Sequence, residues 1–274
     1  MNKEVFKEKL ENNLEEKNSI LAKIYNTDGF SFKALFDEYT SYAQSLKKYI
    51  CDTTIVLNDA LRRRKRILFE GAQGALLDVD HGTYPFVTSS NATAGGASTG
   101  TGIGPNRIDK VIGVVKAYTT RVGEGPFPTE FPKELMEKIR TKGNEFGATT
   151  GRPRRCGWFD SVIVKHSIMV NGIDEIVVTK LDVLDCLDSL RICTAYKYEG
   201  RLYKDFPSDI KVLSNCVPQY EELPGWKEDT ASITSYSRLP RNAKNYLKRI
   251  QDILNTKIVL VSVGSDRKQT FSRE

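Results

Sequence analysis

Apolar residues in the first quarter of the chain recur three and four positions apart among Lys and Glu, which is the period of an amphipathic helix. This spacing predicts helices over residues 3–23 and 32–64. Residues 26–29, Asn-Thr-Asp-Gly, are turn formers and separate the two segments. Neither segment brings reactive side chains together, so we expect residues 1–65 to form a helical scaffold region.

The pattern changes after residue 65, where short apolar runs alternate with further amphipathic segments. Alternating strands and helices are typical of α/β proteins, in which helices cover a parallel sheet. We therefore predict an α/β fold with a largely parallel central sheet and flanking helices, and expect residues 66–274 to form one continuous domain. The predicted strands are residues 66–71, 175–179, 190–196 and 257–261, and the predicted helices are residues 107–118, 158–169 and 241–254.

The composition is that of a folded protein with a basic surface. With 274 residues, 39% of them hydrophobic, the chain can bury the core of one large or two smaller domains. The net charge of +6 and the pI near 8.9 suit either nucleic acid or an anionic metabolite. The densest basic run, residues 62–66, follows a helical segment, and cations in a last helical turn complement the helix dipole. No RNA-binding aromatic signature or helix-turn-helix spacing occurs, so a helix end is favoured and we expect no nucleic-acid partner.

Targeting signals and cysteine usage favour a cytoplasmic protein. Mean hydropathy is −0.40 and no apolar run approaches the length of a membrane span, so no membrane association is expected. The N-terminal segment is charged and lacks the apolar centre of a secretory signal. The cysteines are odd in number, widely spaced and without a Cys-x-x-Cys pair, which favours a reducing compartment and argues against structural zinc. They are Cys51, Cys156, Cys186, Cys193 and Cys216.

The loop over residues 147–155 combines three arginines, two threonines and two glycines. Arginine presents a planar fork of donors that matches carboxylate and phosphate oxygens. The glycines let the backbone bend close to a ligand. This composition favours a loop that grips an acidic small molecule, with a solvated basic loop as the alternative.

Two strand ends carry residues suited to a purine nucleotide, and ligands of open α/β sheets gather at the carboxyl ends of strands. After the strand over residues 66–71, the amide of Gln73 could donate to and accept from a heterocycle edge, or could cap a turn. After the strand over residues 175–179, the spacing of Lys180 and Asp182 resembles the Lys-x-Asp guanine reader of GTP-binding proteins. A carboxylate there accepts from the ring N–H and the exocyclic amine of guanine, and the lysine stem lies over the base.

Two further segments are candidates for the same site. Gly264, after the last predicted strand, allows close backbone approach to a ligand, although an ordinary turn is the alternative. The polar loop over residues 87–96 is rich in hydroxyls and glycine and could cradle a phosphate ester, or could be a flexible linker. His81, between Asp80 and Gly82, is either catalytic or a turn residue, and the turn is favoured.

Taken in order, these segments closely resemble adenylosuccinate synthetase, the family that joins IMP to L-aspartate with GTP. The likeness extends from about residue 66 to residue 267 and is weaker through the N-terminal helices. It implies a fold related to the P-loop NTPases, a homodimer and a requirement for Mg²⁺. The matching runs are residues 69–74, 80–85, 87–91, 120–123, 125–130, 143–152 and 179–185.

The resemblance implies roles for individual residues. Gln73 matches a glutamine that contacts the hypoxanthine base and its 6-phosphoryl intermediate, which makes it the catalytic candidate in this chain. Thr88 matches a threonine that binds the IMP 5′-phosphate. Arg152 would bind the aspartate carboxylate near IMP, and Arg154 would bridge towards GTP. The implied IMP-binding residues are Gln73, Leu77, Thr88, Val122 and Arg152.

The other two ligands are assigned in the same way. The implied aspartate-binding residues are Ala148, Thr149, Thr150, Gly151, Arg152, Pro153 and Arg154. The implied GTP-binding residues are Arg154, Lys180, Leu181, Asp182, Ser262, Val263 and Gly264. The family reaction phosphorylates the 6-oxygen of IMP and then displaces phosphate with the aspartate amine, and catalysis is largely positioning and charge stabilisation.

The departures from the family pattern matter as well. No glycine-rich phosphate loop of the Gly-Asp-Glu-Gly-Lys-Gly-Lys type occurs in the sequence, and Pro153 stands where the family often has arginine. The catalytic aspartate and histidine and the Mg²⁺ ligands belong to the absent segment, so we expect no metal ligand in this chain. We therefore expect an N-terminally truncated, C-terminal portion of the enzyme that is inactive alone. The alternative is a non-catalytic nucleotide-binding fragment or a degenerate homologue.

Overall fold

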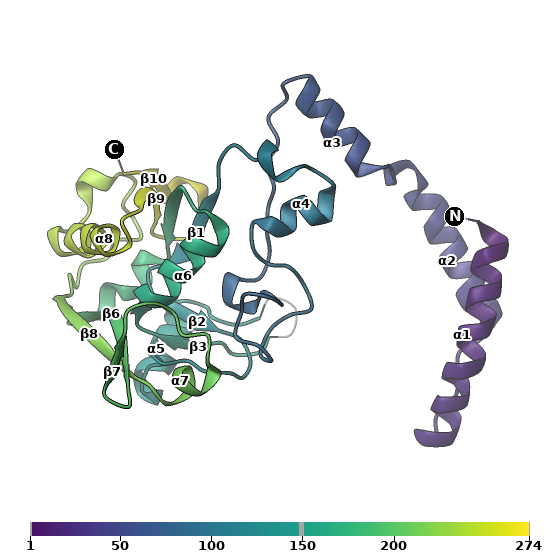
Figure 1. Cartoon of the computed structure of the whole chain (residues 1–274), viewed down its shortest axis with the longest axis horizontal. Helices are drawn as coiled ribbons and strands as arrows, with labels where there is room; N and C mark the ends of the chain where they lie inside the picture. The colour runs from purple at the N-terminus through teal and green to yellow at the C-terminus, as the bar shows by residue number, and fades with distance from the viewer. Residues whose placement is uncertain (1, 148–150, 274) are drawn as a thin grey trace. The chain divides into compact units, whose positions relative to one another are not determined.

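The computed structural model describes residues 2–147 and 151–273 (Figure 1). Contacts between Cα atoms divide the chain into two compact units, Met1–Arg66 and Ile67–Glu274. The first unit is helical and the second carries every described strand.

The first unit consists of α1 (Lys3–Ile24), α2 (Phe32–Leu46), the short 3₁₀ helix η1 (Lys47–Tyr49) and α3 (Thr53–Arg62). The phenyl rings of Phe6 and Phe36 stack between α1 and α2, with centroids 5.6 Å apart. The helix predicted at residues 3–23 is confirmed, but the single helix predicted at residues 32–64 is wrong. The chain restarts at Asp52, whose carboxylate accepts a hydrogen bond from the backbone N–H of Ile55 at 3.2 Å and caps α3.

The basic run begins in the last turn of α3. Arg62 ends the helix and forms an ion pair with Asp59 one turn earlier. A helix therefore ends where this run begins, as predicted, but residues 63–66 lie beyond α3. Within the described residues, no helix combines the length and the apolar character needed to cross a membrane.

The central sheet of the second unit has the strand order β1-β5-β9-β10. β1, β5 and β9 are mutually parallel, and β10 pairs antiparallel with β9. The prediction of a largely parallel central sheet is confirmed, and the expected strands at residues 175–179 and 257–261 are two of its members. The bounds are β1 (Ile112–Lys116), β5 (Glu175–Thr179), β9 (Lys257–Ser262) and β10 (Thr270–Ser272).

A second sheet and a two-stranded ribbon complete the strands. β6 pairs in parallel with β4 and antiparallel with β7 and β8, and it contains the strand predicted at residues 190–196. The ribbon joins β2 to β3. The bounds are β2 (Thr119–Arg121), β3 (Arg155–Gly157), β4 (Phe159–Asp160), β6 (Ser189–Tyr198), β7 (Arg201–Tyr203) and β8 (Val217–Pro224).

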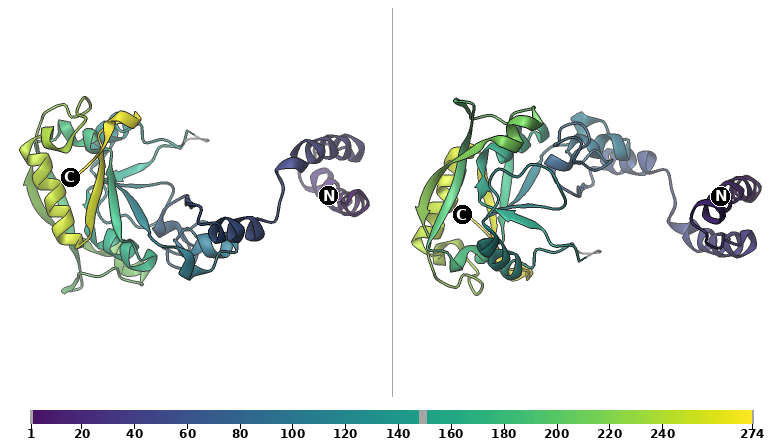
Figure 2. Two further views of the ribbon diagram at one scale, coloured as in Figure 1. Left: turned by 90° about the horizontal axis from the view of Figure 1, so that it is seen from above. Right: turned by 90° about the horizontal axis from the view of Figure 1, so that it is seen from below.

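The core lies where α8 packs against the sheets, and this helix contacts both β8 and β9 (Figure 2). Leu247 and Ile250 are fully buried, and the hydroxyl of Tyr246 donates to the Ala117 carbonyl at 2.7 Å. The α helices are α4 (Gly95–Thr101), α5 (Lys133–Lys142), α6 (Ser161–Asn171), α7 (Ile210–Asn215) and α8 (Arg241–Leu254). The 3₁₀ helices are η2 (Ala75–Leu77), η3 (Pro105–Arg107), η4 (Leu181–Cys186), η5 (Tyr236–Arg238) and η6 (Arg267–Gln269).

Two predicted elements of this unit are wrong. Residues 107–118 were expected to be helical but contain β1, because their apolar positions suit an edge strand as well as a helix. The pairing brings Gly113 so close to Ile173 that an added Cβ would lie 2.7 Å from the isoleucine Cδ1. The strand expected at residues 66–71 has no partner among the described strands, and Leu68 is 90% exposed. The predicted helices at residues 158–169 and 241–254 correspond to α6 and α8.

Candidate functional site

The carboxyl ends of three parallel strands meet at one edge of the central sheet. Lys116 at the end of β1 pairs with Thr179 at the end of β5, and Val178 pairs with Val261 of β9. The segments that begin at Lys180 and at Ser262 therefore leave adjacent strands. Two of the strand-end candidates lie side by side, as the α/β topology predicts.

Asp182, in η4 directly after β5, has an unusual carboxylate. Its Oδ1 atom is buried and accepts no hydrogen bond from any described residue. Burial raises the pKa of this carboxyl, and the nearby Asp185 raises it further. The preceding Lys180 has a left-handed backbone with φ of +58°, a conformation that non-glycine residues adopt at a cost and often at functional sites. A buried acceptor without a donor is suited to a ligand N–H.

The neighbouring carboxylate has its partners within the protein. Asp185 accepts from the indole Nε1 of Trp226 at 2.6 Å, from the backbone N–H of Thr230 at 2.8 Å and from the Thr230 hydroxyl at 2.9 Å. These bonds anchor the segment after β8 to the β5 end of the sheet. Of the two carboxylates, Asp182 is therefore the candidate guanine acceptor.

The segment after β9 is held in a closed turn. Ser262 Oγ donates to the Gly264 carbonyl at 2.9 Å, and the Val263 N–H donates to the Gln269 carbonyl at 2.9 Å. A Cβ at Gly264 would lie 2.2 Å from Gln269 Oε1, so only glycine fits this turn without movement of the glutamine. The Gln269 side chain also donates to the Ala231 carbonyl at 2.7 Å, next to the segment anchored by Asp185. Ser262, Val263 and Gly264 thus lie on a rigid turn.

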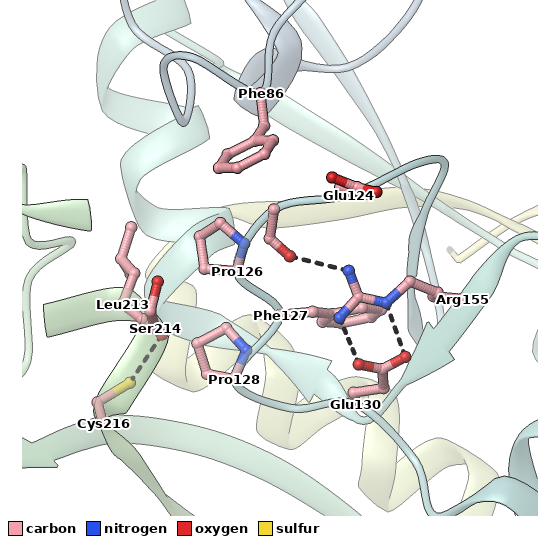
Figure 3. A pocket seen from close by; sticks show the side chains of 11 residues that line it. Phe86, Glu124, Pro126, Phe127, Pro128, Glu130, Arg155, Leu213, Ser214 and Cys216 are labelled. Carbon is pink, nitrogen blue, oxygen red and sulfur yellow. Dashed lines mark hydrogen bonds and ion pairs between the residues drawn. The ribbon is translucent and has the colours of Figure 1, made fainter. Parts of the chain in front are cut away.

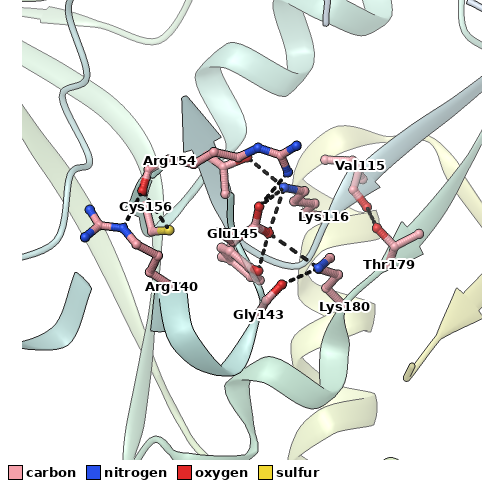
Figure 4. Close-up of polar contacts among 11 residues, drawn as sticks. Val115, Lys116, Arg140, Gly143, Glu145, Arg154, Cys156, Thr179 and Lys180 are labelled. Atoms are coloured by element: carbon pink, nitrogen blue, oxygen red, sulfur yellow. Dashed lines mark hydrogen bonds and ion pairs between the residues drawn. The ribbon is translucent and has the colours of Figure 1, made fainter. Parts of the chain in front are cut away.

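Glu145 is the centre of a charged cluster at the same edge of the sheet (Figure 4). Its side chain is fully buried and accepts from Lys116 Nζ at 2.7 and 2.8 Å, from the Tyr118 hydroxyl at 2.6 Å and from Arg154 Nη1 at 2.8 Å. Lys180 Nζ lies 3.8 Å from the same carboxylate. Burial alone would raise the pKa of Glu145, but the donors outweigh burial and hold that pKa below its ordinary value.

The base of the arginine-rich loop is built on Glu145. The Arg154 N–H donates to the Glu145 carbonyl at 2.9 Å, Phe146 and Pro153 form an isolated bridge, and the Gly147 N–H donates to the Arg152 carbonyl at 2.8 Å. These contacts close the loop, and Gly151 takes a left-handed φ of +64°. The aspartate-binding candidates Ala148, Thr149 and Thr150 lie outside the described residues.

The third arginine of the loop is engaged elsewhere. Arg155 forms a two-pronged ion pair with Glu130 and donates from Nη1 to the Gly125 carbonyl at 2.8 Å (Figure 3). Its guanidinium also lies over the Phe127 ring, 5.3 Å from the centroid. It borders an open hollow of about 510 Å³, lined also by Phe86 and other residues. The sequence grouped the three arginines, but Arg155 has a structural role apart from the Glu145 cluster.

The candidate IMP contacts fall on a compact loop rather than on a strand end. Gln73 is exposed and has a left-handed φ of +62°. The Thr88 N–H donates to the Leu77 carbonyl at 2.8 Å, which ties two of the candidates together. Because residues 66–71 form no strand, the expectation that Gln73 follows a strand of the sheet is wrong.

Asp78 holds this loop to the polar segment over residues 87–96. Its buried carboxylate accepts backbone N–H groups from Asp80 at 2.9 Å, His81 at 2.9 Å and Thr93 at 3.0 Å. Burial alone would raise the pKa of Asp78, but these donors hold it at about 2. His81 lies in the turn, as favoured from the sequence, and its carbonyl contacts His166 Nε2 at 3.2 Å.

Arg121 brings the remaining IMP candidate to the same region. Its Nη2 donates to Thr83 Oγ1 at 2.9 Å and to the Phe86 carbonyl at 3.0 Å. The next residue, Val122, is 41% exposed and therefore accessible beside this loop. Gln73, Leu77, Thr88 and Val122 come from two segments that Arg121 joins.

Comparison with known proteins identifies the family. The sequence profile described as adenylosuccinate synthetase matches residues 1–271. The chain belongs to this family. The adenylosuccinate synthetase of Bacillus licheniformis is 53% identical over 270 residues, covering 98% of this chain and 63% of that protein. The one from Brachyspira hyodysenteriae is 54% identical over 271 residues, covering 99% of this chain and 64% of that protein.

The fold agrees with the family as well. The structure of the fully ligated adenylosuccinate synthetase from Plasmodium falciparum superimposes with a TM-score of 0.92 at 38% sequence identity, covering 100% of this chain and 64% of that one. The resemblance and the α/β fold class inferred from the sequence are confirmed. The chain spans less than two thirds of the length of each of these relatives.

Sequence reasoning missed two buried charged residues that organise this region, Glu145 and Arg121. Glu145 and Arg121 both lie in runs that carry the family likeness, but nothing in their spacing shows that a fold will bury them. Glu145 follows Asn144, whose φ is +46°, in the turn after α5, and its carboxylate contacts Lys116 of β1. A buried charge becomes visible only when its partners are assembled in three dimensions.

The family resemblance also implies a requirement for Mg²⁺. Across residues 2–147 and 151–273, no group of three or more His, Cys, Asp or Glu side chains is arranged to hold one. The carboxylates at the site are bound by N–H donors or, for Asp182, placed singly. The described residues therefore provide no cluster of side chains that could hold Mg²⁺ on its own.

Proposed function

We propose that this chain supplies the IMP, L-aspartate and GTP contacts for the GTP-dependent ligation of IMP and L-aspartate to adenylosuccinate, a step of purine and AMP biosynthesis that releases GDP and phosphate. Membership of the adenylosuccinate synthetase family supports this assignment. The observation that carries it is the buried Oδ1 of Asp182, which has no hydrogen-bond partner among the described residues and lies beside the turn at Gly264.

The guanine base is recognised by Asp182. Its carboxylate accepts from the ring N–H and the exocyclic amine of guanine, a donor pair that adenine lacks. Lys180 lies over the base with its aliphatic stem, and Leu181, Ser262, Val263 and Gly264 surround it. Arg154 extends from the Glu145 cluster towards the nucleotide.

IMP is activated in the first chemical step. The γ-phosphoryl group of GTP moves to the 6-oxygen of IMP, which gives GDP and 6-phosphoryl-IMP and converts a poor leaving group into a good one. Gln73 contacts the base and its 6-phosphoryl group, Leu77 and Val122 border the base, and Thr88 binds the 5′-phosphate. The protein acts mainly by positioning these groups.

L-Aspartate reacts in the second step. Its amine nitrogen attacks C6, the bond from C6 to the phosphorylated oxygen breaks, and phosphate leaves with that oxygen. Arg152 binds an aspartate carboxylate, and the loop that also includes Gly151, Pro153 and Arg154 holds the substrate. Arginine forks suit this task because they bind carboxylates in two-pronged geometry.

The remaining parts of the machinery lie outside these groups. Residues 1–274 contain no glycine-rich phosphate loop, so the chain alone does not transfer the phosphoryl group. The catalytic aspartate, the histidine and the Mg²⁺ ligands are supplied by a further segment, and the assembled enzyme is a cytoplasmic homodimer. The free state of all five cysteines accords with the cytoplasmic assignment.

A complementation assay tests the proposal. The purified chain is mixed with IMP, GTP and L-aspartate, alone and with a phosphate-loop segment from a family member, and adenylosuccinate is measured. We expect product only with both parts. In the complemented enzyme, Asp182→Asn should reduce the preference for GTP over ATP by ten-fold or more, because a lost hydrogen bond to a charged group costs roughly 1.5 to 3 kcal/mol.

Three outcomes would contradict parts of this scheme. Turnover by the chain alone would show that the phosphate loop is dispensable. A correctly folded, complemented enzyme without product would support the alternative of a nucleotide-binding fragment or degenerate homologue. Unchanged discrimination between GTP and ATP in Asp182→Asn would remove the guanine-reading role.

A further inference from the structure

We propose that Glu145 couples the aspartate loop to the guanine-binding lysine, so that L-aspartate and guanine nucleotide tighten each other's binding. This inference rests on the proposed function of Arg154 and Lys180. It makes Glu145 a positioning residue that touches neither ligand.

The geometry joins both arms to one carboxylate. Glu145 holds Arg154 through its side chain at 2.8 Å and through its backbone carbonyl at 2.9 Å. The same side chain faces Lys180 Nζ at 3.8 Å, which is an ion pair but longer than a hydrogen bond. Lys180 Nζ donates instead to the carbonyl of Gly143, two residues before Glu145 (Figure 4).

The charges make this arrangement responsive. One buried carboxylate is shared by Lys116, Arg154 and Lys180, so cations outnumber anions in the cluster. Desolvation makes these interactions stronger than on a surface, and burial lowers the pKa of Lys116. Each cation attracts Glu145 and repels the other two.

The sign of the coupling follows from this balance. An acidic ligand that neutralises Arg154 or draws it away removes its repulsion of Lys180 and withdraws one donor from Glu145. The carboxylate then attracts Lys180 more strongly, which fixes the lysine stem where the guanine base lies. By linkage, nucleotide binding tightens aspartate binding by the same factor.

Two residues, Tyr118 and Glu221, provide control substitutions for this experiment. Lys116 and Tyr118 hold Glu145 from the side of β1 and β2, and Lys116 donates further to Thr120 Oγ1 at 2.9 Å. These contacts fix the carboxylate but join neither ligand arm. Loss of the Tyr118 hydroxyl should therefore lower stability without removing the coupling. Glu221 on β8 offers a second control, because it accepts from Arg249 Nε at 2.7 Å in a different sheet.

The experiment measures the dissociation constant of GDP by calorimetry, without and with saturating L-aspartate, on the full 274-residue chain. For the unsubstituted protein we expect aspartate to tighten GDP binding by at least about 5-fold, the low end of typical coupling energies. Glu145→Gln should bring this ratio below about 2-fold. Tyr118→Phe should keep the full ratio. Glu221→Gln, which makes the same charge change as Glu145→Gln, should also keep it.

A second measurement leaves Glu145 in place in case its substitution prevents folding. In a double-mutant cycle for GDP affinity, Arg154→Met and Lys180→Met should deviate from additivity by at least about 2-fold, as expected for residues in one network. Additive effects would overturn the inference. So would an unchanged aspartate ratio in Glu145→Gln, or an equal loss of that ratio in Tyr118→Phe.

The two levels of the proposal fail differently. If the unsubstituted chain binds neither GDP nor L-aspartate, the proposed function fails and this inference fails with it. If both ligands bind to the unsubstituted chain but do not affect each other, or if Glu145→Gln keeps the coupling, only the role of Glu145 is overturned.

Discussion

Asp78→Asn tests whether one buried carboxylate organises the proposed IMP loop. Both carboxylate oxygens of Asp78 accept backbone N–H groups, Oδ1 from Asp80 and His81 and Oδ2 from Thr93. An amide keeps only one acceptor oxygen and turns two N–H donors towards a further donor. The substitution should therefore loosen the contact between residues 78–81 and the polar loop.

The magnitude follows from the pKa. The pKa of Asp78 falls from 3.8 to about 2 in the folded chain. Each pKa unit corresponds to about 1.4 kcal/mol, so the ionised carboxylate contributes about 2 kcal/mol to the free energy of folding. Because folding lowers the pKa of this acid, the stabilisation is present at high pH and is lost at low pH. The contribution is complete well above pH 3.8 and is lost as the pH falls through about 2. At pH 3 roughly half remains, about 1 kcal/mol.

Urea unfolding at pH 7 and pH 3 provides the assay, followed by the fluorescence of Trp158 and Trp226, which both lie in the second unit. We expect Asp78→Asn to lower the free energy of unfolding at pH 7 by at least about 2 kcal/mol, and by about 1 kcal/mol less at pH 3. Asp80→Asn is the control, because Asp80 is exposed and its carboxylate accepts a side-chain bond from Asn91. A difference that does not change with pH, or equal effects of the two substitutions, would refute the reasoning.

Two further predictions concern packing and pH. Gly157→Ala should lower the free energy of unfolding by about 1 to 3 kcal/mol in urea titrations, because its Cβ would lie 2.4 Å from the Thr129 carbonyl oxygen. Gly100→Ala in α4 is the control, because its Cβ would meet no atom within 4 Å, and it should be neutral or slightly stabilising. A larger loss of stability in Gly100→Ala than in Gly157→Ala would contradict the packing argument. Burial raises the pKa of Asp160 to about 6, so the folded state holds its proton more tightly than the unfolded state and stability falls as the pH rises from about 4 to 6. Relative to Asp160→Asn, the unsubstituted chain should lose about 2 kcal/mol between pH 4 and pH 7, and parallel pH profiles would exclude this role.

The sequence correctly predicts those elements whose hydrophobic pattern is compatible with only one type of secondary structure. The strand over residues 175–179 and the strongly amphipathic helix α8 were both found, because the strand has an apolar centre at residues 176–178 and the helix keeps one apolar stripe. The helix prediction for residues 107–118 is wrong because β1 lies at an edge of its sheet. Val114 is 73% exposed there, so the alternation of buried and exposed residues that marks a strand is incomplete. Local periodicity does not report whether a neighbouring strand is present.

The same limit applies to the site. Lys180 and Asp182 were singled out from their spacing, and the structure places them on a strand end beside the Ser262 turn. The buried Glu145 was not, because its importance lies in donors from the end of β1, from the turn between β1 and β2 and from the arginine loop, which the fold brings together. Motif spacing can identify residues that are close in sequence, such as Lys180 and Asp182. It cannot identify partners that only the fold brings together.

The strand order of the central sheet also determines when the Asp182 carboxylate and the Ser262 turn can come together during synthesis of the chain. β5 lies between β1, which precedes it, and β9, which is made last of the three. Until Lys257–Ser262 have left the ribosome, β5 can pair on one side only, and its open edge is exposed to other nascent chains. Because distant parallel pairings form slowly, the interval before β9 docks is the period of greatest aggregation risk for this protein.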